Sequence, residues 1–208
     1  MGSEASLKGS SARLWKLVEE RMQTGADVAA IDRRIWDLFG EEWSVMFTDL
    51  AGFSRQVARF GIIHFLQILL EQKRLLLPVI EKHDGILIKI EADSLLVLFK
   101  RPAHALACAI EMQRTCQAVS ARRVPEEQVV LCCGLGHGRL LKIGDDDVFG
   151  HEVNLASKLG EDTAKGNEIL VTRAFRESCG ELPGASWEEQ RIEHSGEDVC
   201  WRVGYTRA

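Results

Sequence analysis

Residues 85–99, with the sequence GILIKIEADSLLVLF, decide the fold of this 208-residue chain. Two apolar runs, GILIKI (85–90) and LLVLF (95–99), flank the short polar turn EADS. Apolar runs of this length on either side of a tight polar turn are typical of a β-hairpin. The sequence therefore predicts a β-hairpin over residues 85–99.

The segments next to the hairpin alternate between helix and strand patterns. Upstream, WSVMFTDL predicts a strand, with Val45, Phe47 and Asp49 on one face, and a long helical pattern follows it. Downstream, a second helical pattern leads into the strand VVLCCGLG. The ranges are strand 43–50, helix 54–82 with interruptions at Gly61 and Pro78, helix 103–118, and strand 129–136. The order β-α-β-β-α-β predicts an α+β fold with a ferredoxin-like core.

Additional elements are expected at both ends of this core. Residues 1–40 predict a tail and two short amphipathic helices, because apolar residues recur at helical spacing on either side of Thr24–Gly25. Their apolar faces would cover the core, a second copy or another domain. Residues 41–208 form the second unit, which ends in a C-terminal extension. That extension comprises a helix near 151–163, a strand at 168–172, and closing strands near 187–193 and 199–204.

The composition narrows the class of protein. With 26 Lys and Arg against 31 Asp and Glu, the net charge is −5, which disfavours a nucleic-acid partner that needs a broad basic face. The longest apolar runs are far shorter than the ~20 residues of a membrane span, so we expect no membrane partner. The start of the chain has no apolar signal segment, and the six cysteines form no CxxC pair. We therefore expect a cytoplasmic protein with unpaired, mostly buried thiols.

The topology concentrates carboxylates at one edge of the expected sheet. In a ferredoxin-like sheet the first and third strands are antiparallel neighbours, so Asp49, near the end of one, meets Asp93, before the other. Two close carboxylates repel each other unless a cation compensates, and Mg²⁺ with substrate phosphates is a natural occupant. The turn through Gly52 and Phe53 would present N–H groups and a helix N-terminus to an anion. The alternative is a structural one, in which Asp49 caps a helix and Asp93 makes a turn.

Three blocks of the sequence resemble a known family. FTDLAGFS (47–54) is similar to the F-x-D-[IL]-x-G-F-[ST] signature of the class III nucleotidyl cyclases, the adenylate/guanylate cyclase catalytic domain. HDGILIKIEADSLLVLF (83–99) resembles the family's H-G-G-x-x-x-K-x-x-G-D-x-x-x-x-x-F segment. DVFGHEVNLASKL (147–159) resembles D-x-x-G-x-x-V-N-x-A-x-R-L. The blocks occur in the family's order, and the matched region runs from about Trp43 to Val203.

The resemblance implies a metal-dependent site. Asp49 and Asp93 would bind two Mg²⁺ or Mn²⁺ ions, with the Leu50 carbonyl as a further ligand. In such a site the ribose 3′-hydroxyl attacks the α-phosphorus of a nucleoside triphosphate, and pyrophosphate leaves. The family builds each site between two chains, so the resemblance also implies a homodimer with two equivalent sites.

The resemblance further implies the residues that would bind substrate and act on it. Lys89 and Asp147 match the positions that read the base, and their donor–acceptor pattern suits adenine, so ATP is favoured. Asn154 matches the residue that orients the ribose, and Lys158 occupies the position of a transition-state Arg. Each residue also has a structural alternative: Lys89 as an edge-strand lysine, Asp147 as part of a solvated turn, and Asn154 as a surface amide.

The sequence departs from the family pattern in four places. Lys158 keeps the charge of the family's Arg but lacks its planar fork. Ala92 replaces the Gly before the second metal Asp. The family's triphosphate-binding Lys aligns with His194 or Ser195, and the segment 138–150 is shorter than the usual arm that reaches across the dimer. These departures predict slow turnover.

Two functions follow from these observations. The first is a metal-dependent adenylate cyclase, a phosphorus–oxygen lyase that converts ATP to 3′,5′-cyclic AMP and pyrophosphate for intracellular signalling. The alternative is a catalytically weak cyclase-homology domain that binds nucleotide or a partner as a dimeric signalling module. Retention of Asp49 and Asp93 favours the enzyme, whereas Lys158 and the absent triphosphate Lys favour the module.

Overall fold

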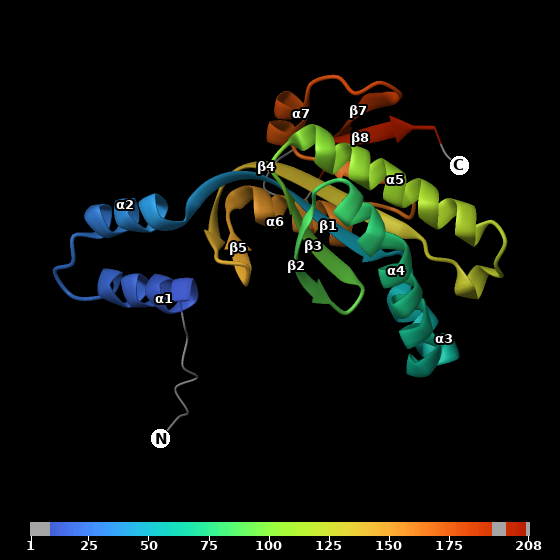
Figure 1. Cartoon of the computed structure of the whole chain (residues 1–208), viewed down its shortest axis with the longest axis horizontal. Helices are drawn as coiled ribbons and strands as arrows, with labels where there is room; N and C mark the ends of the chain where they lie inside the picture. The colour runs from blue at the N-terminus through green and yellow to red at the C-terminus, as the bar shows by residue number, and fades with distance from the viewer. Residues whose placement is uncertain (1–8, 193–198, 207–208) are drawn as a thin grey trace.

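A central, mostly antiparallel sheet organises the protein, and its computed structural model describes residues 9–192 and 199–206 (Figure 1). The strands are β1 Gly40–Leu50, β2 Ile86–Glu91, β3 Ser94–Phe99, β4 Leu131–Ile143, β5 Asp147–Phe149, β6 Ile169–Val171, β7 Ala185–Arg191 and β8 Val199–Tyr205. The α-helices are α1 Gly9–Arg21, α2 Val28–Phe39, α3 Phe53–Phe60, α4 Ile62–Lys82, α5 Pro102–Ser120, α6 His151–Ser157 and α7 Arg173–Cys179. A 3₁₀ turn spans Pro125–Glu127 (η1), and a π-helical turn spans Lys158–Thr163 (η2).

The strand order confirms the ferredoxin-like core. Within the described part of the chain, one sheet runs β2-β3-β1-β4-β6-β8-β7, with β5 paired to β4 outside this path. β1 is antiparallel to both β3 and β4, so the first and third strands are neighbours as expected. The extension joins through β6, which is parallel to β4.

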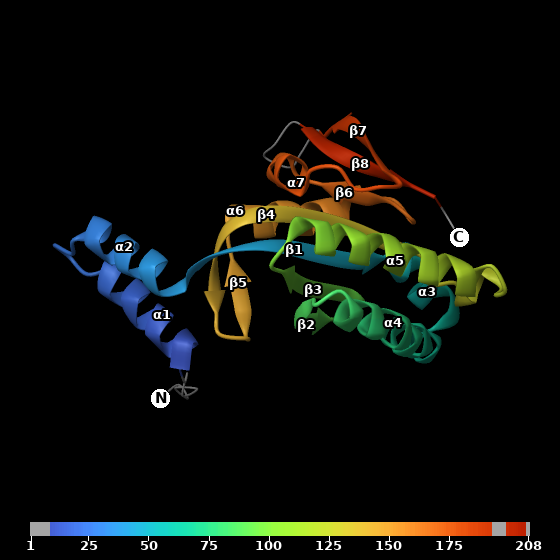
Figure 2. The ribbon, with the colours of Figure 1, turned by 45° about the horizontal axis from the view of Figure 1, so that its top comes forward.

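Alternating side chains of β1 divide the interior into two layers. Met46 packs into the larger cluster beneath α4, α5 and α7, which Figures 1 and 2 show on one face of the sheet. Val45 and Phe47 pack on the opposite face with Val153 and Ala156 of α6. The predicted common face of Val45, Phe47 and Asp49 is therefore the α6 face.

Several element boundaries differ from the prediction. Pro78 lies inside α4 and does not interrupt it, because buried neighbours such as Leu76 and Val79 anchor that turn despite the lost N–H donor. Gly61 does separate α3 from α4. β4 runs on to Ile143, where β5 pairs with it, and the predicted helix 151–163 continues beyond Ser157 as the π turn. β5, α7 and the 3₁₀ turn were not expected.

The two N-terminal helices pack against their own chain. Leu17 and Ile35 lie in a small cluster with Ile143, at the far end of β4, and Figure 2 shows this helical hairpin at the N-terminal end of the long first strand. Helix α1 starts at Gly9, and three apolar residues of this region, Met22, Val28 and Leu38, are exposed and lie outside the cluster.

The cysteines behave as the composition predicts. All six are free, and burial raises the pKa of each thiol, to about 12 for Cys108, Cys116 and Cys132. Buried thiols with raised pKa values are inert. A membrane-crossing helix, which would have to be both long and apolar, is not found among the described residues.

Candidate active site

The two candidate metal ligands come together at the ends of neighbouring strands. The β1–β3 register pairs Thr48 with Leu95, which places Asp49 and Leu50 opposite the β2–β3 turn that contains Asp93. The Leu50 N–H donates to Oδ2 of Asp93 at 3.4 Å. The predicted meeting of the two carboxylates at this sheet edge is therefore present in the structure.

Burial and like charge both destabilise the ionised form of Asp49. Partial burial raises the pKa of Asp49 to about 7, and the neighbouring Asp93 carboxyl adds to the shift. Glu161 raises the pKa of Asp49 by a smaller amount, whereas a hydrogen bond from the Leu50 N–H lowers it. Because burial and like charge both disfavour ionisation, Asp49 is about half protonated at pH 7 in the absence of a cation.

The donor set at this edge fits a hard divalent cation. Two carboxylates can supply oxygen ligands, and such ions bind proteins through one or two carboxylates together with substrate phosphates. In residues 9–192 and 199–206, no group of three His, Cys, Asp or Glu side chains gathers as a self-sufficient metal cage. Asp49 and Asp93 thus fit an ion that completes its coordination with water or with a phosphate ligand.

The two turns beside the pair adopt left-handed backbone conformations. Gly52 has φ 84° and immediately precedes α3, which begins at Phe53, so the predicted turn into a helix N-terminus is present. Ala92 has φ 51°, although L-residues with a side chain rarely adopt this region. The departure from Gly at this position therefore keeps the turn but makes it strained.

Lys89 and Asp147 form an ion pair across two strands. Nζ of Lys89 lies 2.6 Å from Oδ2 of Asp147, and the side chains are 34% and 29% exposed, so a ligand can reach both. A register shift between Leu87 and Lys89 marks a β-bulge at Ile88. Bulges re-aim side chains. Here Leu87 packs beneath α4, while Lys89 lies opposite Leu96 on the α6 face.

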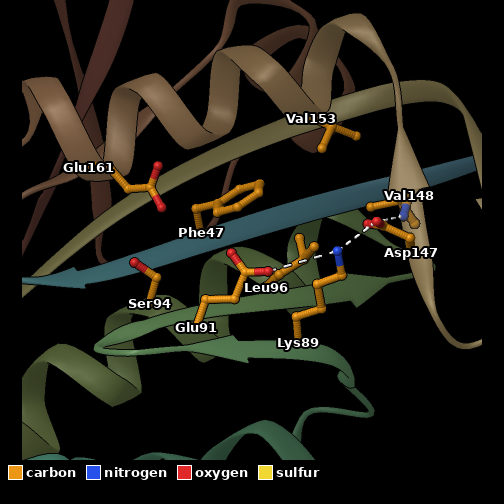
Figure 3. A pocket seen from close by; sticks show the side chains of 9 residues that line it. All are labelled: Phe47, Lys89, Glu91, Ser94, Leu96, Asp147, Val148, Val153 and Glu161. Atoms are coloured by element: carbon orange, nitrogen blue, oxygen red, sulfur yellow. Dashed lines mark hydrogen bonds and ion pairs between the residues drawn. The ribbon is translucent and has the colours of Figure 1, made fainter. Parts of the chain in front are cut away.

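The ion pair lines a small open pocket of about 130 Å³. Figure 3 shows Lys89 and Asp147 at one side of it, with Glu161 across from them beside Phe47. Glu161 extends from the π turn, and Oγ of Ser157 donates to it at 2.6 Å. The sequence did not point to Glu161, because a π turn places it outside ordinary helical spacing.

Asn154 lies in α6 and Lys158 at its C-terminal end, whereas the carboxylate pair lies in β1 and in the β2–β3 turn. Both residues are exposed, and the Lys158 N–H donates to the Asn154 carbonyl at the end of α6, so they share a helix face as predicted. Neither lines the pocket beside Lys89. The other candidate phosphate ligands, His194 and Ser195, lie outside the described residues.

A second residue that the sequence did not single out is Gln72 of α4. Its side chain is completely buried, and Nε2 donates to the main-chain carbonyl of Asp93 at 2.6 Å. The sequence signal for Gln72 was a polar residue at a position where the buried face of α4 is otherwise apolar.

Comparisons with known proteins identify the family to which this sequence is similar. The family model described as the adenylate and guanylate cyclase catalytic domain matches residues 39–198. The chain is 29% identical over 163 residues to the serine/threonine-protein kinase pkn2 of Myxococcus xanthus, covering 71% of this chain and 19% of the relative. It is 29% identical over 117 residues to putative adenylate cyclase 3 of Rhizobium meliloti (strain 1021), covering 56% and 20%.

The chain thus spans about a fifth of the length of these curated relatives. Among solved structures, the adenylyl cyclase CyaB from P. aeruginosa superposes with a TM-score of 0.68 and 20% identity, covering 81% of this chain and 96% of that one. This likeness concerns the fold, whereas the family model covers most of the sequence. The chain therefore belongs to the family of class III adenylate and guanylate cyclase catalytic domains.

Proposed function

We propose that this domain is a metal-dependent adenylate cyclase that converts ATP to 3′,5′-cyclic AMP and pyrophosphate in the cytoplasm. The observation that carries the proposal is the Asp49–Asp93 pair, in which burial and, next, the neighbouring Asp93 carboxyl raise the pKa of Asp49 to about 7. A carboxylate pair built at this cost is useful where a cation compensates it. The six unpaired cysteines support a reducing compartment.

Asp49, Asp93 and the Leu50 carbonyl would hold the metal, Mg²⁺ or Mn²⁺, as two ions per site. When bound, the metal supplies Lewis acidity that lowers the pKa of the ribose 3′-hydroxyl and neutralises charge on the triphosphate. The N–H groups at the start of α3, after Gly52, would donate to phosphate oxygens. The 3′-oxygen forms a bond to the α-phosphorus, the bond to the β-phosphate oxygen breaks, and the hydroxyl proton passes to solvent.

Lys89 and Asp147 support adenine as the base. A Lys donor and an Asp acceptor match a ring nitrogen and an exocyclic amine, whereas guanine requires a different pattern. In the free domain the two side chains bind each other at 2.6 Å. ATP would exchange this ion pair for two contacts to the base, and a base with the wrong pattern would leave both groups without partners.

The exposed positions of Asn154 and Lys158 support a two-chain site. Asn154 and Lys158 are exposed and do not line the pocket beside Lys89, which supports a second copy that would supply them to the ATP held by Asp49 and Asp93. Asn154 would orient the ribose, and Lys158 would place positive charge beside the α-phosphate. A symmetric homodimer then carries two such sites.

A direct assay tests the proposal. Purified protein is incubated with Mn²⁺ and, separately, ATP, GTP, CTP and UTP, and the products are resolved by chromatography. We expect cyclic AMP from ATP, its loss in Asp93→Asn, and its retention in Asp146→Asn, which removes an exposed carboxylate remote from the pair. Absence of any cyclic nucleotide would contradict the proposal.

The alternative is a cyclase-homology module that binds nucleotide or a partner without appreciable turnover. The specific observation in its favour is Lys158, a flexible point charge where the family has a planar guanidinium. Equilibrium binding of ATP by a dimer that forms no product in the same assay would support this second function.

A further inference from the structure

Gln72 is an exception on the buried face of α4. That face packs beneath the sheet through apolar side chains, which include Phe65, Ile68, Leu76 and Val79. Gln72 lies among them with none of its surface exposed. A long polar side chain at such a position loses hydration and rotamer freedom, so it needs a compensating contact.

The contact that Gln72 makes is to the turn that carries Asp93. Nε2 of Gln72 donates to the Asp93 carbonyl at 2.6 Å. Glu91 and Ser94 pair across the hairpin, so Ala92 and Asp93 form a two-residue loop. A positive φ at the first loop residue alone is the feature of a type II′ turn, which prefers Gly, yet Ala92 occupies it. The loop is therefore strained and needs external support.

The rest of the Gln72 amide is not satisfied. Oε1 is buried and has no hydrogen-bond partner among the described residues. A buried acceptor without a partner costs stability, and an apolar side chain of the same length would avoid that cost. What an apolar residue could not do is hold the Asp93 carbonyl. Support of this loop is the one polar interaction that distinguishes Gln72 from the neighbouring apolar residues.

We propose that Gln72 is a positioning residue that orients the Asp93 carboxylate for metal binding; this inference rests on the proposed function of the site. Fixing the carbonyl of Asp93 fixes the direction of its Cα–Cβ bond. The carboxylate itself has only a long contact at 3.4 Å to the Leu50 N–H. Without Gln72 the strained loop can relax, and the carboxylate samples orientations that do not suit a shared cation.

The experiment compares two buried glutamines in the full-length chain. Gln113 of α5 is equally buried, also donates to main-chain carbonyls, those of Leu131 and Glu168, and also has a buried Oε1 without a partner in the described chain. Its contacts are not to the hairpin that carries Asp93. Gln72→Met and Gln113→Met therefore make the same chemical change, one at the loop and one away from it.

The primary measurement is Mn²⁺ binding at pH 8 without nucleotide, followed by electron paramagnetic resonance. Loss of a group that orients a metal ligand typically weakens affinity about 10- to 100-fold. We expect that increase in the Mn²⁺ Kd for Gln72→Met and an unchanged Kd for Gln113→Met. Urea unfolding in EDTA should show Gln72→Met to be no less stable than Gln113→Met, which separates positioning from a merely structural role.

The controls separate this inference from the proposed function. If Asp93→Asn binds Mn²⁺ as the parent does, the metal site itself is wrong. If Asp93→Asn loses binding and Gln72→Met retains the parent Kd, the role of Gln72 is overturned and the proposed function stands. Should Gln72→Met fail to fold, the Mn²⁺ Kd of Gln72→Asn is measured instead and has the same meaning. The Asn amide is one methylene too short to reach the Asp93 carbonyl.

Discussion

Replacing Asp49 by Asn should stabilise the metal-free domain while abolishing cyclisation. The substitution keeps the shape of the side chain and removes the charge that Asp93 repels. The pKa of Asp49 is raised from 3.8 to about 7, chiefly by burial and next by Asp93. In the folded protein the ionised carboxylate is therefore less favourable than in the unfolded chain, whereas an amide has no such penalty.

The magnitude follows from the size of this pKa difference. A rise from 3.8 to about 7 corresponds to about 4 kcal/mol, and solvent screening of a half-buried carboxyl reduces this to about 2 kcal/mol. Because the folded pKa is the higher one, the stabilising contribution of the protonated form is complete below pH 3.8 and is lost as pH rises through 7. The advantage of Asp49→Asn should therefore be full at pH 8 and small at pH 4.5.

Urea unfolding in EDTA at both pH values measures the effect, with Asp146→Asn as the matched control. At pH 8 we expect the free energy of unfolding to be about 2 kcal/mol higher for the Asn variant, and thermal unfolding in the same buffer should show a melting temperature about 4–8 °C above that of the parent. Mn²⁺ should stabilise the parent and not the variant, because a ligand stabilises only the state that binds it. If Asp49→Asn is less stable than the parent at pH 8 in EDTA, burial and repulsion of the ionised Asp49 do not destabilise the fold, and our reasoning is refuted.

Three further predictions test other parts of the site. Ala92→Gly should raise the free energy of unfolding by about 1 kcal/mol, because Gly relieves the positive φ; an unchanged denaturation midpoint would contradict this. Lys89→Glu with Asp147→Cys should move the ratio of kcat/KM from ATP towards GTP; a parent that prefers GTP would refute the base assignment. Lys158→Arg should raise kcat and Lys158→Ala should lower it by ~10²-fold with little change in KM; equal kcat for Lys158→Ala and the parent would remove its transition-state role.

The central fold was predictable because its strands have strong apolar patterns and short connections. The hairpin at 85–99 and the run before Asp49 establish which strands pair, and the register confirmed this. The misses have local causes. Burial against the sheet stabilised the helix through Pro78, and glycines concealed the length of β4. β5, with three residues, is too short to give a periodic signal.

The sequence could predict those site positions that follow from the strand order. It could not predict the side-chain orientations that depend on local irregularities of the backbone. Asp49 and Asp93 meet because β1 and β3 are neighbours, which the strand order implies. The facing of Lys89 depends on the bulge at Ile88, and the placement of Glu161 depends on a π turn, and neither irregularity has a reliable sequence signal. Gln72 acts on a main-chain carbonyl 21 residues away, a contact that periodicity alone does not reveal.

Two destabilising features of this domain, the repulsion between Asp49 and Asp93 and the strained backbone of Ala92, lie at the β2–β3 turn. The adjoining strand β3 explains why the fold tolerates them. The repelling carboxylates and the strained Ala92 lie next to β3, whose residues Leu95, Val97, Leu98 and Phe99 have no exposed surface. Strained conformations persist only where the surrounding structure over-determines them, and this strand sits between β2 and β1. The rigid strand therefore keeps Asp93 near Asp49 even when no cation offsets the repulsion.

Amide hydrogen exchange tests whether the β2–β3 turn is less stable than the strand that follows it. Without metal the Asp93 amide should exchange much faster than the amides of β3, and Mn²⁺ should slow the exchange of the Asp93 amide alone. Equal protection of the loop and the strand in EDTA would mean that the turn is not the weak point.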